Sequence, residues 1–308
     1  KTATDLVNDQ TTVTLSIGKN SSTSTVTNAA DVVFVLDKST SIEVKNQALA
    51  MLSELQDHSE TNNVKIQVGV VTFNNNANNT EFNLDLTDLN DESYSKIQNI
   101  FSKNLSDGTN IEAGIRKGMK MLASDNETSD SYKHLVLVTD GVTYLWGENA
   151  VNTIYVGYQH HDGQYLIWNS NSLASGITDK SKLKITDSTY VSSFADPDQW
   201  ISDNENGIEA TLQEYEVSWG DTSKYIDTES LKENESVYTA QDIAVYKAGK
   251  AWQEANQRGY HLYSYVSNLY WNDGITTNRE GDYPWAANFF SNLYQIGGDS
   301  FMFTDTDT

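Results

Sequence analysis

Cysteine is absent from the 308 residues of the chain, so a disulfide framework, a thiolate metal site and a cysteine nucleophile are all excluded. Basic residues are scarce. Lys and Arg total 20 against 43 Asp and Glu, and the net charge of -23 argues against nucleic acid, anionic membrane surfaces and acidic substrates as partners. A cation, or a protein with basic regions, suits this charge better; the alternative is that the charge only keeps the surface solvated.

Long hydrophobic runs are also missing. No apolar stretch approaches the roughly 18–20 residues that a membrane span needs, and the first residues are polar rather than signal-like. We therefore expect a soluble chain, either an ectodomain excised from a longer protein or an enzyme.

Short apolar runs alternate with helical periods along most of the chain. Strands are predicted where apolar and β-branched residues cluster or alternate with polar ones, at 32–36, 66–73, 82–86, 135–138, 260–266 and 301–303. Helices are predicted where apolar residues keep helical spacing, at 42–58, 92–102, 111–122, 239–259 and from Pro284 to about 297. This alternation indicates an α/β fold, a doubly wound and mostly parallel central sheet with helices on both faces.

Changes in composition divide the chain into three parts. Residues 1–30 are predicted to form an N-terminal edge strand, in which Val13, Leu15 and Ile17 alternate with polar residues, and a linker. The α/β pattern occupies residues 31–146 and 238–308. Residues 147–237 have no long helical period and are rich in Tyr, Trp, Asn, Asp and Ser, so we interpret them as an inserted arm region.

The segment Asp37-Lys38-Ser39-Thr40-Ser41 has the pattern D-x-S-x-S, which is too common to indicate a site by itself. Residues 91–95 match the pattern as well, but no apolar strand precedes them, and we expect Asp91 to cap the helix that follows. Asp37, in contrast, directly follows a predicted buried strand. Its position places the carboxylate and both serine hydroxyls at the carboxyl end of that strand, where open α/β sheets bind ligands.

Two further oxygen donors are predicted at the same edge of the sheet. Asp140 follows the predicted strand 135–138, and Thr109 lies just before the helix that begins near Ile111. Carboxylate and hydroxyl oxygens suit a hard divalent cation, Mg²⁺ above Mn²⁺ or Ca²⁺. Neutral hydroxyls would leave such an ion short of negative charge and receptive to a carboxylate from a partner. The alternative is that the two aspartates cap helices and the hydroxyls bond to the backbone.

Together these segments resemble a known family. Asp37, Ser39 and Ser41, then Thr109, then Asp140, separated by β–α units, resemble the metal-ion-dependent adhesion site of von Willebrand factor type A domains, over about residues 31–304. The resemblance implies one cation at the top of the sheet, ligated directly by some of these residues and through water by others. Thr40 departs from the family pattern, in which Gly is frequent, but the ligand positions themselves are intact.

Within that family, four segments resemble the adhesive domain at the tip of sortase-assembled pili of Gram-positive bacteria. They are residues 31–39, the strand 12–17, the large insertion after Asp140 and the strand 260–266. In that group, insertions form arms beside the metal. The resemblance implies a location on the bacterial cell wall or pilus tip. It also implies two partners: a host matrix or cell-surface protein that offers an acidic side chain, and other pilus subunits bound through regions outside this chain. The alternative is a subunit of metal-chelatase type that mediates protein–protein assembly.

Aromatic residues near the predicted cation site are candidates for ligand contacts, namely Tyr144, Trp146, Tyr155 and Trp168. The insertion as a whole contains several Tyr and Trp residues, which form either a recognition surface or a small core of the insertion; they are Tyr155, Tyr158, Tyr165, Trp168, Trp200 and Trp219. An enzyme is not expected, because no G-x-S-x-G elbow, Gly-rich phosphate loop or P-loop lysine supports one.

Overall fold

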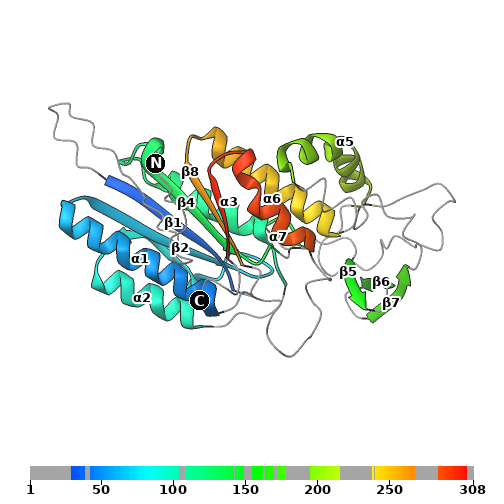
Figure 1. Ribbon diagram of the computed structural model, residues 1–308, viewed down its shortest axis with the longest axis horizontal. Helices are drawn as coiled ribbons and strands as arrows, with labels where there is room; N and C mark the ends of the chain where they lie inside the picture. The colour runs from blue at the N-terminus through cyan, green and yellow to red at the C-terminus, as the bar shows by residue number, and fades with distance from the viewer. Residues whose placement is uncertain are drawn as a thin grey trace, which may run out of the picture.

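A six-stranded sheet forms the centre of the computed structural model (Figure 1). The structure describes residues 29–38, 42–103, 108–141, 143, 145–148, 155–161, 164–169, 172–177, 195–215, 238, 240–267 and 284–303. The predicted edge strand around Val13 to Ile17 lies outside this part of the chain.

The strands of this sheet follow the order β3-β2-β1-β4-β8-β9. Their bounds are Ala29–Asp37 for β1, Lys65–Phe73 for β2, Leu84–Asp88 for β3, Lys133–Thr139 for β4, His261–Ser267 for β8 and Asp299–Phe303 for β9. All neighbouring pairs are parallel except β2 and β3, which are antiparallel. The predicted doubly wound, mostly parallel sheet is thereby confirmed. Strand β3 begins two residues later than predicted, because residues 80–82 form a 3₁₀ turn that the side chain of Asn79 caps.

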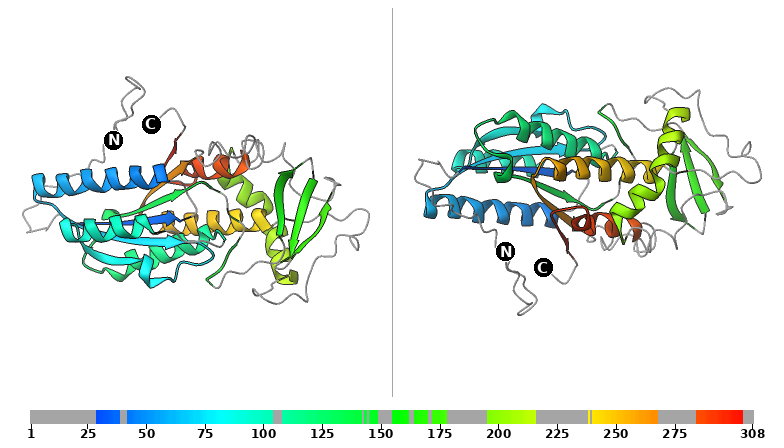
Figure 2. Two further views of the ribbon diagram at one scale, coloured as in Figure 1. Left: turned by 90° about the horizontal axis from the view of Figure 1, so that it is seen from below. Right: turned by 90° about the horizontal axis from the view of Figure 1, so that it is seen from above.

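Helices cover both faces of the sheet (Figure 2). Their bounds are Ile42–Asn62 for α1, Asp91–Ser102 for α2, Ile111–Ser124 for α3, Pro197–Tyr215 for α5, Ala240–Gln257 for α6 and Pro284–Ser291 for α7. Strand β1 serves both faces, since Val32 and Phe34 pack in the core that includes α1 and α2, whereas Val33 and Val35 pack in the core that includes α3, α5, α6 and α7. This explains why the apolar run 32–36 has no polar alternation.

Helix α3 lies unusually close to the sheet because two of its residues have no side chain. A Cβ atom added at Gly114 would lie 2.5 Å from Cδ1 of Phe73 and 2.9 Å from Cγ1 of Val35. One added at Gly118 would lie 2.8 Å from Cγ2 of Val35. These distances are far shorter than van der Waals contact, so only glycine at both positions permits this packing.

The beginning of α2 differs from the sequence prediction by one residue. Asn90, not Asp91, is the N-cap: its side chain accepts hydrogen bonds from the backbone N–H groups of Glu92 and Ser93, and Ser93 Oγ in turn accepts from the N–H of Asn90. Both residue types favour this position, but the reciprocal bond to Ser93 selects Asn90. Asp91 is the first residue of the helix and its side chain accepts from Gln56.

The predicted insertion contains two kinds of structure. Strands β5 (Tyr155–His161), β6 (Gln164–Asn169) and β7 (Ser172–Ile177) form a separate antiparallel sheet beyond the N-terminal end of α6 (Figures 1 and 2). Helix α5 was not predicted, although Asp196 accepts a cap bond from the N–H of Gln199 and Pro197 begins the helix. Its apolar residues belong to the same core as α6 and α7.

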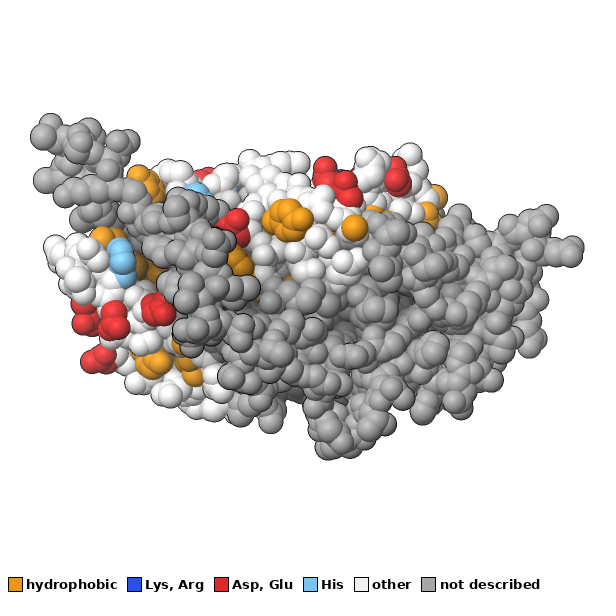
Figure 3. All heavy atoms as spheres, viewed as in Figure 1, with side chains coloured by type: hydrophobic (Ala, Val, Ile, Leu, Met, Phe, Trp, Pro, Cys, Tyr) orange, Lys and Arg blue, Asp and Glu red, His pale blue; other side chains and the backbone are white. Residues whose placement is uncertain are grey.

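Two properties of the surface and helices agree with the composition. Acidic side chains are visible at several places on the face drawn in Figure 3, in keeping with the net charge of -23. None of the helices in the described part of the chain is long and apolar enough to cross a membrane.

Candidate metal site

The two predicted aspartates lie at the carboxyl ends of neighbouring strands. Asp37 is the last residue of β1, and Asp140 directly follows β4. The two strands are parallel and in register up to Leu36 and Val138, so both aspartates leave the sheet at the same edge. From β1 the chain continues to β2 and β3 on one side and then returns to β4 on the other. This reversal of strand order is the place where open α/β sheets form ligand sites.

Both aspartates are buried, with 1% of Asp37 and 3% of Asp140 exposed. The hydroxyl of Thr139 donates a hydrogen bond of 2.9 Å to Oδ2 of Asp37, and the N–H of Gly141 donates one of 3.0 Å to the same hydroxyl. The carboxylate of β1 is thus oriented by the last residue of β4. Two buried carboxyl groups at one edge require compensation, which hydrogen bonds or a bound cation supply.

Thr109 is 5% exposed and lies just before α3, as the sequence predicts. Its carbonyl oxygen accepts hydrogen bonds from Thr143 Oγ1 at 3.1 Å and from the N–H of Leu145 at 3.2 Å. Residues that follow Asp140 therefore hold the backbone of Thr109. The loops that contain two of the predicted ligands are joined by direct hydrogen bonds.

Asn110 connects three loops and was not singled out from the sequence. It is fully buried, and its Oδ1 accepts from the N–H of Ala113, which makes it the N-cap of α3. Its Nδ2 donates to the carbonyl oxygens of Asn75 at 3.1 Å and Gly147 at 2.8 Å. An asparagine directly before a helix is a recognisable cap signal, but the two long-range bonds have no counterpart in the sequence pattern.

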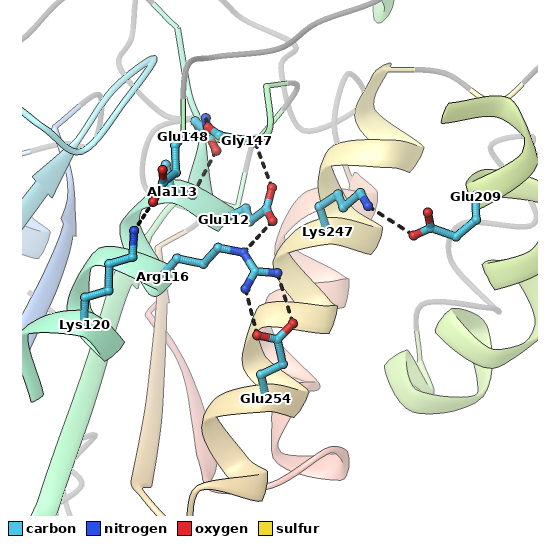
Figure 4. A network of polar contacts seen from close by, with 10 residues as sticks. Glu112, Ala113, Arg116, Lys120, Gly147, Glu148, Glu209, Lys247 and Glu254 are labelled. Atoms are coloured by element: carbon cyan, nitrogen blue, oxygen red, sulfur yellow. Dashed lines mark hydrogen bonds and ion pairs between the residues drawn. The ribbon is translucent and has the colours of Figure 1, made fainter. Parts of the chain in front are cut away.

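A network of charged side chains continues from this loop into the helices (Figure 4). Glu112 accepts a hydrogen bond of 2.8 Å from the N–H of Gly147 and one of 2.6 Å from Nε of Arg116. Arg116 also binds both carboxylate oxygens of Glu254 on α6, at 2.7 and 3.1 Å. Hydrogen bonds to Glu254 in the first place, and to Glu112, raise the pKa of Arg116 despite its partial burial. The loop after Asp140 is thereby tied to α3 and α6.

Five of the predicted site residues lie wholly or in part outside the described residues, and a sixth is buried. Ser39, Ser41 and Tyr144 lie outside the described residues, as do the side chains of Tyr155 and Trp168, whose backbones belong to β5 and β6. Trp146 is 4% exposed and packs in the core with α3, α5 and α6. Its ring therefore lies in the interior, and the ligand contact predicted for it stays a prediction.

Trp200 also differs from the expectation for the insertion. It forms neither a recognition surface nor a small core of the insertion, because its ring is 3% exposed and packs edge-on against Phe289 of α7, with ring centroids 5.7 Å apart. Trp200 belongs to the main core.

The described donors fit a hard cation. Asp37, Asp140 and Thr109 offer carboxylate and hydroxyl oxygens, the donor type that Mg²⁺ and Ca²⁺ prefer. Among the residues that the structure describes, no group of three or more His, Cys, Asp and Glu side chains is placed to hold a metal ion. A cation at this edge would thus depend on two carboxylates supplemented by hydroxyls.

Comparison with family models identifies the domain. Residues 31–155, which include β1 to β4 and the edge just described, match the model of the von Willebrand factor type A domain. Residues 31–155 thus belong to the von Willebrand factor type A family. The family predicted from the five ligand positions is confirmed, and no curated protein matches the chain.

Solved structures of similar architecture include bacterial pilus proteins. Against the pilus adhesin SpaC from Lactobacillus rhamnosus GG in its open conformation, the identity is 15% and the TM-score 0.46, over 91% of this chain and 28% of that one. For the von Willebrand factor domain of the type V pili tip protein Mfa5 from Porphyromonas gingivalis, the identity is 13% and the TM-score 0.47, over 90% of both chains. For the minor pilin PilB from Streptococcus sanguinis, the identity is 15% and the TM-score 0.46, over 92% of this chain and 59% of that one. The chain thus spans about a quarter of SpaC.

Proposed function

We propose that this von Willebrand factor type A domain holds one divalent cation, Mg²⁺ in preference to Mn²⁺ or Ca²⁺, and uses it for adhesion. The proposed ligands are Asp37, Ser39, Ser41, Thr109 and Asp140. The observation that supports the proposal most is the burial of Asp37 and Asp140 at the ends of adjacent parallel strands. Buried carboxylates at a reversal of strand order lie where open α/β sheets bind ligands, and a bound cation would offset part of the cost of burying their charge.

Each residue has a distinct part in this proposal. Thr139 orients the carboxylate of Asp37 through its hydrogen bond to Oδ2. Asp140 supplies the second negative charge, and Thr109, fixed by Thr143 and Leu145, supplies a neutral oxygen. When bound, the cation would supply a coordination position for an acidic side chain of a partner. With only two carboxylate ligands the cation keeps enough positive charge to attract that side chain, whereas four carboxylates would neutralise it.

Adhesion at a bacterial cell surface is the biological context that we propose. It is supported by the order of the ligand positions and by the large insertion after Asp140, both of which resemble adhesive domains at pilus tips. In this proposal the partners are a host extracellular-matrix or cell-surface protein and other pilus subunits. The insertion, whose β5–β7 sheet lies beyond the end of α6, determines specificity.

Metal binding is tested by calorimetric titration of Mg²⁺ into the wild type and Asp140→Ala. We expect Asp140→Ala to weaken binding by more than about 100-fold, since loss of even an outer-shell partner of a metal ligand costs 10- to 100-fold. Asp91→Ala is the matched control, because Asp91 begins the same D-x-S-x-S pattern on the exposed end of α2. Equal affinities for wild type and Asp140→Ala would contradict the site.

Adhesion is tested separately, by binding to a panel of extracellular-matrix proteins in Mg²⁺ and in chelator. We expect binding that requires both Mg²⁺ and Asp140. Equal binding in all conditions would refute a metal-dependent mechanism. Tight Mg²⁺ binding without any matrix partner would favour the assembly subunit instead, and turnover of phosphoester or acyl substrates, which we do not expect, would favour an enzyme.

A further inference from the structure

A buried lysine lies directly beside the proposed metal ligand Asp37. Lys38 is 3% exposed, and its Nζ donates hydrogen bonds of 3.0 Å to the carbonyl oxygens of Ile100 and Phe101. Both carbonyls belong to the last turn of α2. The backbone N–H of Lys38 donates a third bond, of 3.2 Å, to the carbonyl oxygen of Phe73 at the end of β2. Lys38 thus contacts two elements that lie 35 to 63 residues away in the sequence.

The end of α2 is a suitable partner for this lysine. The last carbonyl groups of a helix have no partner within the helix and form the negative end of its dipole. A buried ammonium group, in turn, costs several kcal/mol unless hydrogen bonds compensate for lost water. Each group therefore satisfies the other. Capping alone does not require a buried lysine, because Lys103 already stands at the C-cap of α2 with its own N–H bonded to Ile100.

Lys38 connects two segments that contain proposed metal ligands. On one side, Lys38 lies within the segment 37–41, which contains three of the proposed ligands. On the other, the end of α2 leads through residues 103–108 to Thr109, the fourth. We infer that Lys38 is a positioning residue that ties these two ligand-bearing segments together. The inference rests on the proposed metal site, and its consequence is that replacement of Lys38 weakens cation binding.

The test compares Lys38→Met, which keeps the length of the side chain without its N–H donors, with Lys133→Met. Lys133 is the matched control, since it is equally buried and its Nζ donates to the carbonyl oxygen of Asp125 at 2.7 Å, but at the opposite end of the sheet. Two quantities are measured below the unfolding temperature. One is the Kd for Mg²⁺ alone, and the other is the amide exchange rate of Ile111 and Ala113, whose N–H groups bond to Thr143 and Asn110.

We expect Lys38→Met to raise the Kd about tenfold, the lower end of the range for outer-shell partners of metal ligands, and to speed exchange at both amides in the metal-free protein. Lys133→Met should lower the unfolding midpoint without either effect. Lys38→Arg keeps N–H donors and should bind Mg²⁺ more tightly than Lys38→Met; if Lys38→Met does not fold, Lys38→Arg is compared with the wild type.

Two results would overturn the inference, and they differ from failure of the proposed function. If Lys38→Met lowers stability but leaves both Kd and exchange at wild-type values, the lysine is merely structural. If Lys38→Met exchanges at the wild-type rate and the wild type itself binds no Mg²⁺, the tie and the metal site both fail. Absence of Mg²⁺ binding together with faster exchange in Lys38→Met would refute the proposed function alone.

Discussion

Asp31, the third residue of β1, is fully buried and accepts a hydrogen bond of 3.1 Å from Thr128 Oγ1. Burial in the first place, and then the nearby Asp125, raise the pKa of its carboxyl group from 3.8 to about 6, although Lys133 acts in the opposite direction. The folded state therefore holds a proton on Asp31 at pH values where the unfolded chain has lost it. Stability from this group is fully present below pH 3.8 and is lost as the pH rises through about 6.

Replacement of Asp31 by asparagine should remove this pH-dependent loss. Asn keeps the acceptor for Thr128 and adds N–H donors without charge, so Asp31→Asn should raise the free energy of unfolding at pH 7 by about 1–3 kcal/mol. At pH 3.5 the variant and the wild type should be equally stable. Urea unfolding at the two pH values measures the difference. The exposed Asp85→Asn serves as control, and a gain of equal size at both pH values would show that charge is not the cause.

At the scale of elements, α3 is joined to α6 by an asymmetric ion pair. Arg116 contacts Glu112, whose side chain is 6% exposed, and Glu254, whose side chain is 45% exposed. Water screens the outer contact and hardly reaches the inner one. The two carboxylates therefore depend on Arg116 to different degrees, although the hydrogen-bond distances are similar.

Substitutions on either side of this pair should differ in cost. Arg116→Met leaves Glu112 buried without its counter-ion and should destabilise the protein by about 2–3 kcal/mol, less than a fully buried pair because Arg116 is partly exposed. Glu254→Gln should cost less than about 1 kcal/mol. Urea denaturation of both variants gives the comparison. Equal costs would mean that Glu112 does not need Arg116.

At the scale of the whole molecule, α5 joins the insertion to the α/β core. Its residues Trp200, Ile201 and Ile208 belong to the same core as α3, α6 and α7. In addition, Lys247 and Lys250 of α6 form ion pairs with Glu209 and Glu205 of α5, the first of which is drawn in Figure 4. We expect the chain from β1 to α7 to unfold as one cooperative unit.

Truncation of Trp200 tests whether the insertion and the α/β core unfold cooperatively. Trp200→Ala should lower the free energy of unfolding by about 3–5 kcal/mol, the usual cost of removing a buried large aromatic side chain, and should leave one transition. Thermal unfolding followed by far-ultraviolet circular dichroism and by tryptophan fluorescence gives the number of transitions. Tyr294→Ala should have little effect, because Tyr294 is 51% exposed. Two transitions, of which Trp200→Ala shifts only one, would show that the insertion unfolds independently.

The outcome of sequence-based prediction differed between local and long-range features. Strands β1 and β4 were predictable because burial on both faces leaves an uninterrupted apolar run, and Asp37 and Asp140 were predictable because they flank those runs. Lys38, Asn110 and Glu112 were not, because their partners are backbone atoms 35 to 63 residues away, and backbone atoms leave no trace in a sequence. Helix α5 was missed because its few apolar residues are widely separated among polar ones.

The two glycines of α3 have a practical consequence for redesign of the proposed binding face. Gly114 and Gly118 let α3 pack directly against Val35 and Phe73. Because Thr109 lies just before α3, this packing also determines the position of Thr109. A library that aims at a new specificity should leave both positions invariant and keep α5. Its diversity belongs in the β5–β7 sheet, whose strands pair only with one another among the described residues.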